Sequence, residues 1–296
     1  MSIRSQFIIG ISLCLIAGFS CERNADIQLK ASQQSLVVEG IIESGKSPQI
    51  ILTHSLPFAT SYDTSVLQDL FIHHAQITVS TQNRQVTLIE KEIDTLPGIL
   101  LYYYEPEENQ HFKGIAGMTY QLQIQTEQKK LEATTTIPRR GFVLDSIWWE
   151  PTLSEDKKDS NKVFLMAKIF DPPQKKDYAR YFTKRNNEPF FSGRVSVAED
   201  AISNGKFFDI RIPRGVPKTL DIDSEDYGYF YRGDTVTLKF CNIDEKTYHY
   251  WHTWEYARSN QGNPFSSPTK VEGNIPGALG YWGGYQVQTK KIIIPK

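Results

Sequence analysis

The sequence is poor in cysteine, with three residues in 296: Cys14, Cys21 and Cys241. Cys14 lies in an N-terminal apolar segment that we expect to be removed, and Cys21 follows directly on its small last residue. Because we expect Cys21 to carry a lipid, only Cys241 would remain as a thiol in the folded body, which excludes an intramolecular disulfide. Because Phe240 and Ile243 lie beside it, we predict that Cys241 is a buried apolar side chain and not a nucleophile.

Charge of one sign is not in excess, and the motifs of common enzymes are missing. The 33 lysines and arginines face 34 aspartates and glutamates, which leaves no basic footprint for nucleic acid. The chain has no G-x-S-x-G elbow, no cysteine with an evident histidine partner, no Walker loop and no dinucleotide glycine fingerprint. We therefore expect a protein that is not an enzyme, needs no cofactor and does not bind nucleic acid.

An apolar run long enough to cross a membrane is absent too. The N-terminal run Phe7–Phe19 spans about 13 residues, whereas a bilayer crossing needs ~20. Arg4 precedes this run, and Ser20 and Cys21 follow it, which is the order of a secretory signal with a lipoprotein-type cleavage site. We predict a lipoprotein signal peptide over residues 1–20 and acylation of Cys21, with an ordinary signal peptide as the alternative.

What the chain does contain is a series of short strand patterns. After a polar tether over residues 21–34, apolar and polar residues alternate in successive runs, which is the period of a strand with one buried face. The runs before the turn at Pro138–Gly141 are Ser35–Glu43, Gln49–Ser55, Ala75–Gln82, Arg84–Glu92, Ile99–Pro106, Thr119–Glu127 and Lys130–Pro138. They predict an immunoglobulin-like or fibronectin-like β-sandwich over residues 35–139, and transthyretin-like or carboxypeptidase-regulatory-like sandwiches would give the same pattern.

A second β-rich domain is predicted over residues 140–296, so the fold class is mainly β. Its strand patterns are Phe142–Pro151, Val163–Pro173, Phe207–Gly215, Asp234–Ile243 and Tyr285–Pro295. One amphipathic, aromatic helix interrupts them near residues 244–260. Asn242 with Glu245 three residues later has the spacing of a capping box, and Gly262 can end the helix.

Three side chains of this helix are weak candidates for a metal site. His249, His252 and Glu255 are three residues apart in turn, so neighbours can face one another, and these are residue types that bind zinc. The pair of histidines four residues apart that zinc hydrolases use is missing. We therefore expect packed histidines and no bound metal, and a metal-dependent hydrolase centred on this helix is the enzymatic alternative.

Aromatic side chains supply the remaining signal for a ligand. Successive rings on a strand point to opposite faces, so some of the rings in the runs around Tyr103 and in the pair Trp148–Trp149 must point away from the core unless a second layer covers them. Tyr281 and Trp282 lie in a stretch that holds five of the glycines and three of the prolines, Asn263–Tyr285. We take these five aromatic residues as binding candidates. The stretch itself we interpret first as a structural clasp against the helix, and second as a partner-binding loop.

This stretch also resembles the C-terminal signature of a Bacteroidota lipoprotein family filed as domain of unknown function 4249. The N-terminal half matches the same family in order but more loosely. The matching segments are Gly262–Phe265, Asn274–Ile275, Gly277 with Leu279 and Gly280, Gly283–Tyr285, and earlier Leu36–Ile42, Gly117–Ile124 and Ala133–Pro138. The resemblance implies outer-membrane lipoproteins that are often encoded beside TonB-dependent receptors, and it brings no enzymatic activity and no catalytic residues.

From the residues and the resemblance together we expect a non-enzymatic outer-membrane lipoprotein. It would be held in the bilayer by an acyl anchor on Cys21, facing either the periplasm or the outside, and would serve as an accessory or ligand-binding partner of a TonB-dependent receptor. A structural or adhesive module of the envelope is the remaining alternative.

Overall fold

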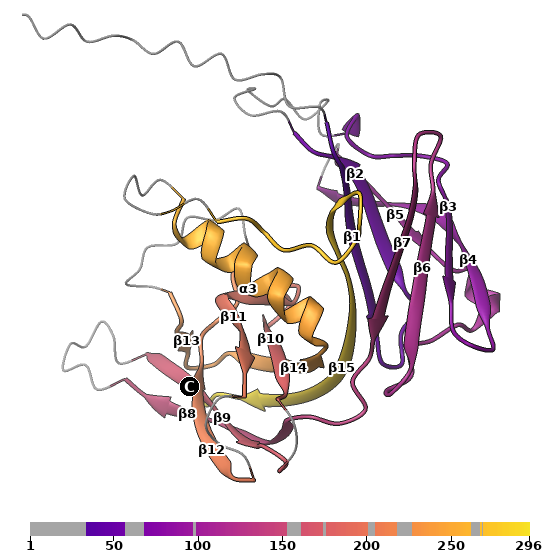
Figure 1. Ribbon diagram of the computed structural model, residues 1–296. Coiled ribbons are helices and arrows are strands. Elements are labelled where there is room, and N and C mark those ends of the chain that lie inside the picture. The colour runs from indigo at the N-terminus through magenta and orange to yellow at the C-terminus, as the bar shows by residue number, and fades with distance from the viewer. Residues whose placement is uncertain are drawn as a thin grey trace, which may run out of the picture. The chain divides into compact units, whose positions relative to one another are not determined.

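The computed structural model describes residues 34–56, 68–96, 99–152, 161–173, 176–200, 205–217, 227–261, 267 and 269–296. The predicted signal peptide, the acylation site at Cys21 and all of the tether except its last residue lie outside the described residues. Gln34–Lys296 is a compact unit. It is built mainly of strands with the helix α3, so the predicted fold class is confirmed (Figure 1).

The strands of the N-terminal half follow the predicted runs closely. They are β1 (Leu36–Glu43), β2 (Gln49–His54), β3 (Gln76–Ser80), β4 (Gln85–Leu96), β5 (Ile99–Glu105), β6 (Thr119–Gln125) and β7 (Lys130–Thr136), with a short 3-10 turn η1 (Glu108–Gln110) between β5 and β6. The remaining elements are β8 (Val143–Pro151), β9 (Lys162–Phe170), β10 (Tyr178–Arg185), β11 (Phe191–Glu199), β12 (Phe207–Ile212), β13 (Phe230–Tyr231), β14 (Thr235–Ile243), α3 (Glu245–Ser259) and β15 (Leu279–Ile293).

Most of these strands join into one sheet that runs through both halves of the chain. Its order is β11-β10-β14-β15-β1-β2-β5-β4-β3-β6-β7. The long strand β4 pairs with β3 through Gln85–Leu88 and with β5 from Ile89 onward. Because β4 changes partner along its length, β3, β6 and β7 share one hydrophobic core with β1, β2 and β5. This is a sandwich-like arrangement, compatible with the predicted immunoglobulin-like fold.

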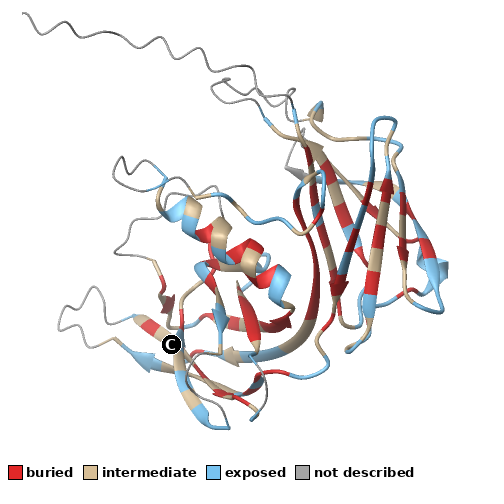
Figure 2. Cartoon of the chain, viewed as in Figure 1, coloured by how far each residue is buried: buried red, intermediate tan, exposed pale blue. Residues whose placement is uncertain are grey.

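In the C-terminal half, other elements pack on both faces of the strands β10 and β14. A smaller sheet holds β12, β9 and β13, with β8 paired to β9. Its side chains share a core with Val236, Leu238 and Phe240 of β14. Cys241 and Ile243 of β14 belong instead to the core beneath α3. The central strands are therefore covered by the small sheet on one side and by the aromatic helix on the other (Figures 1 and 2).

The last strand corrects the prediction for the glycine-rich stretch. We expected a strand from Tyr285, but β15 begins six residues earlier, at Leu279. It pairs in parallel with β1, from Val37 opposite Leu279 to Glu43 opposite Tyr285, and antiparallel with β14. The predicted domain boundary at Pro138–Gly141 falls between β7 and β8, while the sheet itself continues from one half to the other through β15.

Two glycines allow β15 to lie this close to its neighbours. A Cβ atom at Gly280 would lie 2.0 Å from the carbonyl oxygen of Val38, and Gly280 has a φ of 99°. A Cβ atom at Gly284 would lie 2.8 Å from the backbone of Thr136. Only a residue without a side chain fits either position, which accounts for part of the glycine content of the stretch.

The helix lies where it was predicted, but its capping residue is Asp244 and not Asn242. One carboxylate oxygen of Asp244 accepts a hydrogen bond from the backbone N–H of Thr247, at 2.8 Å. The other accepts from Thr135 Oγ1 at 2.6 Å and from the N–H of Thr136 at 3.0 Å, which fastens the helix start to β7. Asn242, the predicted cap, is a buried residue of β14 whose amide donates to the carbonyl of Phe142.

Three strands were not predicted: β10, β11 and β13. We described Lys175–Phe190 only as an aromatic and basic run, yet β10 lies within it. Its first four residues, Tyr178 to Tyr181, are all buried, because α3 lies on one face and the small sheet on the other. A strand buried on both faces shows no alternation, so the period of two could not reveal it.

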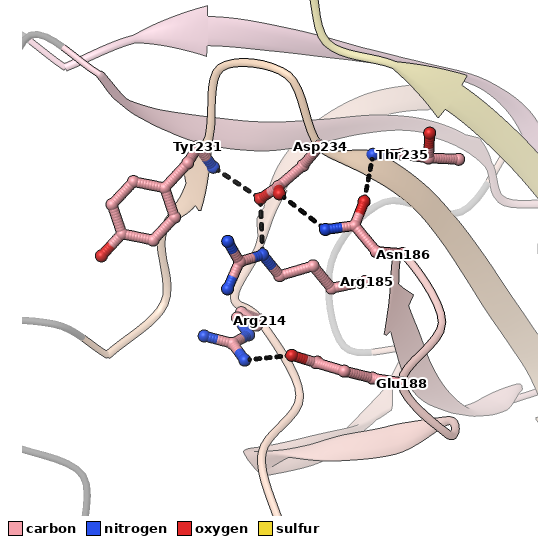
Figure 3. A network of polar contacts seen from close by, with 7 residues as sticks. All are labelled: Arg185, Asn186, Glu188, Arg214, Tyr231, Asp234 and Thr235. Atoms are coloured by element: carbon pink, nitrogen blue, oxygen red, sulfur yellow. Dashed lines mark hydrogen bonds and ion pairs between the residues drawn. The ribbon is translucent and has the colours of Figure 1, made fainter.

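A polar network fastens the turn after β10 to the turn between β13 and β14 (Figure 3). The carboxylate of Asp234 is buried and accepts from Arg185 Nε at 2.7 Å, from the N–H of Tyr231 at 2.8 Å and from Asn186 Nδ2 at 3.0 Å. Asn186 in turn accepts from the N–H of Thr235 at 2.9 Å. Both carboxylate oxygens of Asp234 therefore have partners, so we assign the network a structural role.

Replacing Trp282 with Ala should strongly destabilise the fold. The indole is fully buried in the N-terminal core, and its Nε1 donates to the carbonyl of Tyr120 at 3.2 Å. Loss of a buried tryptophan costs about 3–5 kcal/mol in the free energy of unfolding. Urea denaturation would measure it, with Leu279→Ala as the control on the same strand, because Leu279 is 52% exposed. Equal stability of the two variants would contradict the packing described here.

Replacing Asp234 with Ala should also lower stability, by about 2–4 kcal/mol, because three donors lose their buried acceptor. Glu132→Ala is the control, since its ion pair with Lys130 is well exposed and should contribute less than about 1 kcal/mol. Thermal and urea denaturation of both variants would test this. A control variant that loses as much stability as the Asp234 variant would refute the role of the network.

Candidate functional site

Three adjoining cavities lie on the face of the large sheet that α3 partly covers. Their volumes are about 390, 510 and 310 Å³. Ile41 of β1 lines all three, while Glu39 and Tyr281 are shared by the first and third. We name them the aromatic cavity, the lysine cavity and the tyrosine cavity, in that order. Volumes of this size are typical of sites for small molecules, so this face is the candidate binding surface.

The aromatic cavity is enclosed by rings from four different elements. Phe182 comes from β10, Phe190 from the turn before β11, Trp251 from α3 and Tyr281 from β15. Tyr281 lies against the rings of Tyr250 and Trp251, with centroids 4.6 and 4.9 Å away. Tyr281 therefore does pin the glycine-rich stretch to the helix, as the clasp prediction requires.

A buried arginine lies in the wall of this cavity. Arg180 is only 3% exposed, and its guanidinium carbon is 3.3 Å from the centroid of the Trp251 ring. Its Nε donates to Ser196 Oγ at 3.1 Å and its Nη1 to the hydroxyl of Tyr285 at 3.3 Å. The Tyr285 hydroxyl also accepts from Trp251 Nε1 at 2.9 Å, which fixes the orientation of both neighbours of the guanidinium.

Glu255 supports Arg180 from behind, through Ser196. Its two carboxylate oxygens accept from the N–H and the hydroxyl of Ser196, at 2.9 and 2.5 Å. Burial raises the pKa of Glu255 against the lowering effect of these hydrogen bonds and of Arg180. The carboxylate thus reaches Arg180 only through Ser196.

The two histidines of the helix lie away from Glu255. His252 is exposed and stacks on the ring of Tyr248, at 5.4 Å between centroids. His249 is half-buried, with its Nε2 3.7 Å from a carboxylate oxygen of Glu245. Within the described residues, no group of three His, Cys, Asp or Glu side chains is placed to hold a metal ion. The structure therefore does not bring the three weak metal candidates together.

The lysine cavity is bordered by two ion pairs that meet at the buried carboxylate of Glu43. Lys239 Nζ lies 2.6 Å from one carboxylate oxygen of Glu43, and Lys46 Nζ lies 2.7 Å from the other. Burial opposes ionisation of Glu43, but the two lysines outweigh it and hold its pKa below the ordinary value. Lys113, also at this cavity, is exposed and has no ion pair in the described part of the chain.

The tyrosine cavity contains Tyr103, the only sequence-predicted binding candidate besides Tyr281 that lines any of the three described cavities. Tyr103 of β5 is half-buried and lies beside Tyr102 and the exposed Ile93. A flat, partly exposed ring beside apolar side chains is suited to contact with an apolar or sugar surface.

The remaining aromatic candidates lie elsewhere. Trp148 and Trp149 are half-buried residues of β8, and neither lines the cavities described above. Trp148 Nε1 donates to Glu150, and Arg232 lies over Trp149 with 4.9 Å to the centroid. The prediction of Trp282 as a binding residue was wrong, because its fully buried ring cannot meet a ligand from solvent.

A fourth cavity, of about 260 Å³, was not foreseen from the sequence. It is lined in part by His54, His73 and His74 at the end of the N-terminal sandwich. His73 is paired through its ring with Glu90, which also accepts from the N–H of His74 at 2.9 Å. His54 comes from β2 and the other two histidines from the connection before β3, so only folding brings them to one place.

Cys241 should not react with alkylating reagents in the folded protein. It is fully buried, as predicted, and burial raises the pKa of its thiol to about 12. At pH 8 the thiolate needed for attack is therefore almost absent. Iodoacetamide treatment followed by mass spectrometry of the peptide that contains Cys241 should find it unmodified in the native protein and modified in denaturant. Similar modification of both samples would show that this core is open.

Comparison with known proteins assigns the family. Within the described part of the chain, no helix has the length and apolar composition needed to cross a membrane. Searches of the curated proteins and of the solved structures found no significant match. The profile of one family, described as Domain of unknown function (DUF4249), matches residues 22–291, which includes every strand except the last two residues of β15. The chain therefore belongs to the DUF4249 family.

Proposed function

We propose that the protein is a non-enzymatic, ligand-binding lipoprotein of the outer membrane that acts as an accessory partner of a TonB-dependent receptor. The observation that carries the binding role is the set of three adjoining cavities over β1 and β15, lined by aromatic and charged side chains. Such a concave surface, apolar with a few polar groups that converge on it, is the usual form of a site for a small ligand.

The chemistry of the groups at these cavities favours binding over catalysis. Arg180 is held in place by Ser196 and Tyr285, and Glu43 is paired with two lysines. The sequence also lacks the G-x-S-x-G elbow and a cysteine with an evident histidine partner, either of which would supply an activated nucleophile. The hydrolase alternative draws no support from His249 and His252, which lie apart from Glu255.

The membrane and receptor parts of the proposal have other support. The order of charge, apolar run, small residue and Cys21 favours an acyl anchor. The resemblance of the C-terminal stretch to Bacteroidota lipoproteins supports a TonB-dependent receptor as the partner. Membership of the DUF4249 family is consistent with it.

Affinity isolation of the tagged full chain from detergent-solubilised membranes tests the partnership. We expect a TonB-dependent receptor, identified by mass spectrometry, in near-equal amounts. A Cys21→Ser variant is the control, because without the acyl anchor it should leave the membrane fraction and lose the receptor. Repeated recovery of the anchored protein alone would refute the accessory role.

A further inference from the structure

We infer that the aromatic cavity binds a ligand with a single carboxylate and an apolar body, and that Arg180 holds the carboxylate. This inference rests on the proposed binding function and deepens it, because it names the chemical class of the ligand. Three observations carry it: an available donor on a buried cation, the charges around that cation, and the rings that enclose the remaining space.

The available donor is Nη2 of Arg180. The other guanidinium nitrogens donate to Ser196 and Tyr285, whereas Nη2 has no hydrogen-bond partner among the described residues. Nη2 is also not one of the polar atoms that are sealed from solvent without a partner. Since Arg180 is a lining residue of the cavity, we take Nη2 as the nitrogen that a ligand there would meet. A guanidinium with a free N–H on a fixed plane is well suited to a carboxylate oxygen.

Among the described residues, no carboxylate bonds directly to the guanidinium of Arg180. Glu255 reaches it only through the hydroxyl of Ser196, and the neighbouring Lys239 is already paired with Glu43. Removing a charge from water is costly unless an opposite charge meets it, so an anion in the cavity would be bound favourably. Trp251 and Phe182 add cation–π contacts to the guanidinium but bring no negative charge.

The same surroundings favour a monoanion over a phosphate or another multiply charged group. Glu39 and Glu43 line the cavity together with Arg180. Glu39 is exposed and has no ion pair in the described residues, so its charge repels a second negative charge on the ligand. One available cationic donor beside the unpaired carboxylate of Glu39 matches a ligand with one negative charge.

The rest of the cavity is apolar. Phe182, Phe190, Val216 and Tyr281 present carbon surfaces to a space of about 390 Å³, enough for a ligand the size of a modified amino acid. Phe190 is 37% exposed, so it lies where a ligand can enter from solvent. The body of the ligand would replace water against these rings while its carboxylate meets Arg180.

A matched pair of probes tests the inference. N-acetyl-phenylalanine carries one carboxylate and one ring, and N-acetyl-phenylalaninamide is the same molecule without the charge. Titration calorimetry on the full chain in detergent should show that the acid binds ~10-fold or more tightly than the amide, as a charge-assisted hydrogen bond predicts. Fluorescence quenching on addition of the acid would be measured in the wild-type protein and in Trp251→Phe. Quenching that disappears in Trp251→Phe would place the acid in this cavity.

Three variants separate the possible outcomes. Arg180→Met should remove the preference for the acid, whereas Arg84→Met should leave it unchanged, because Arg84 lies over Phe112 away from the cavity. Phe190→Ala should weaken both probes and keep the preference. Because Phe190 is exposed, this substitution should leave the fold intact. Circular dichroism of each variant would verify folding.

Equal binding of acid and amide, weakened together by Phe190→Ala, would overturn the role of Arg180 and leave the binding function intact. No binding of either probe at 10 mM, roughly the weakest affinity that a built pocket would show, would overturn the inference for this ligand class. Neither result bears on the receptor partnership, which the isolation experiment decides independently.

Discussion

The parallel pairing of β1 with β15 is the constraint on which the rest of the structure depends. It joins the first and last strands of the described fold and makes one sheet of the two halves. It also places Trp282 in the core of the N-terminal sandwich and Tyr281, the preceding residue, against the aromatic helix. Successive side chains of one strand therefore support two different cores, which is what the alternation of a strand allows.

The same pairing builds the floor of the candidate site. On β1, Val38 and Ile42 point into the sandwich core, so Glu39, Ile41 and Glu43 point to the opposite face and line the cavities. Their partners on β15 are Tyr281, Gly283 and Tyr285. The small Gly283 lies between two large rings, and α3 approaches there so closely that a Cβ atom would be 3.0 Å from Thr247. Fold and site thus share one set of backbone contacts.

Much of this could be predicted from the sequence, because local patterns report local structure. The alternating runs gave most strands within a few residues, the aromatic helix was placed correctly, and the burial of Cys241 followed from its apolar neighbours. The strand β10 was not predicted, because it is covered on both faces and shows no alternation. The start of β15 was not predicted, because its glycines suggested turns. The cavities could not be foreseen, since Glu39, Arg180 and Tyr281 come from strands far apart in the chain. The sequence held one sign of the candidate site, which is the arginine at position 180 among the apolar residues from Tyr178 to Phe182.

The meeting of the first and last strands has a consequence for how the chain reaches its folded state. While the polypeptide is being made, β1 emerges early and its partner β15 emerges last, more than 200 residues later. Until then the sandwich lacks Trp282 and one edge of β1 has no partner. Contacts this distant in sequence form slowly. The order of synthesis therefore keeps the whole body from closing until its last strand has been made.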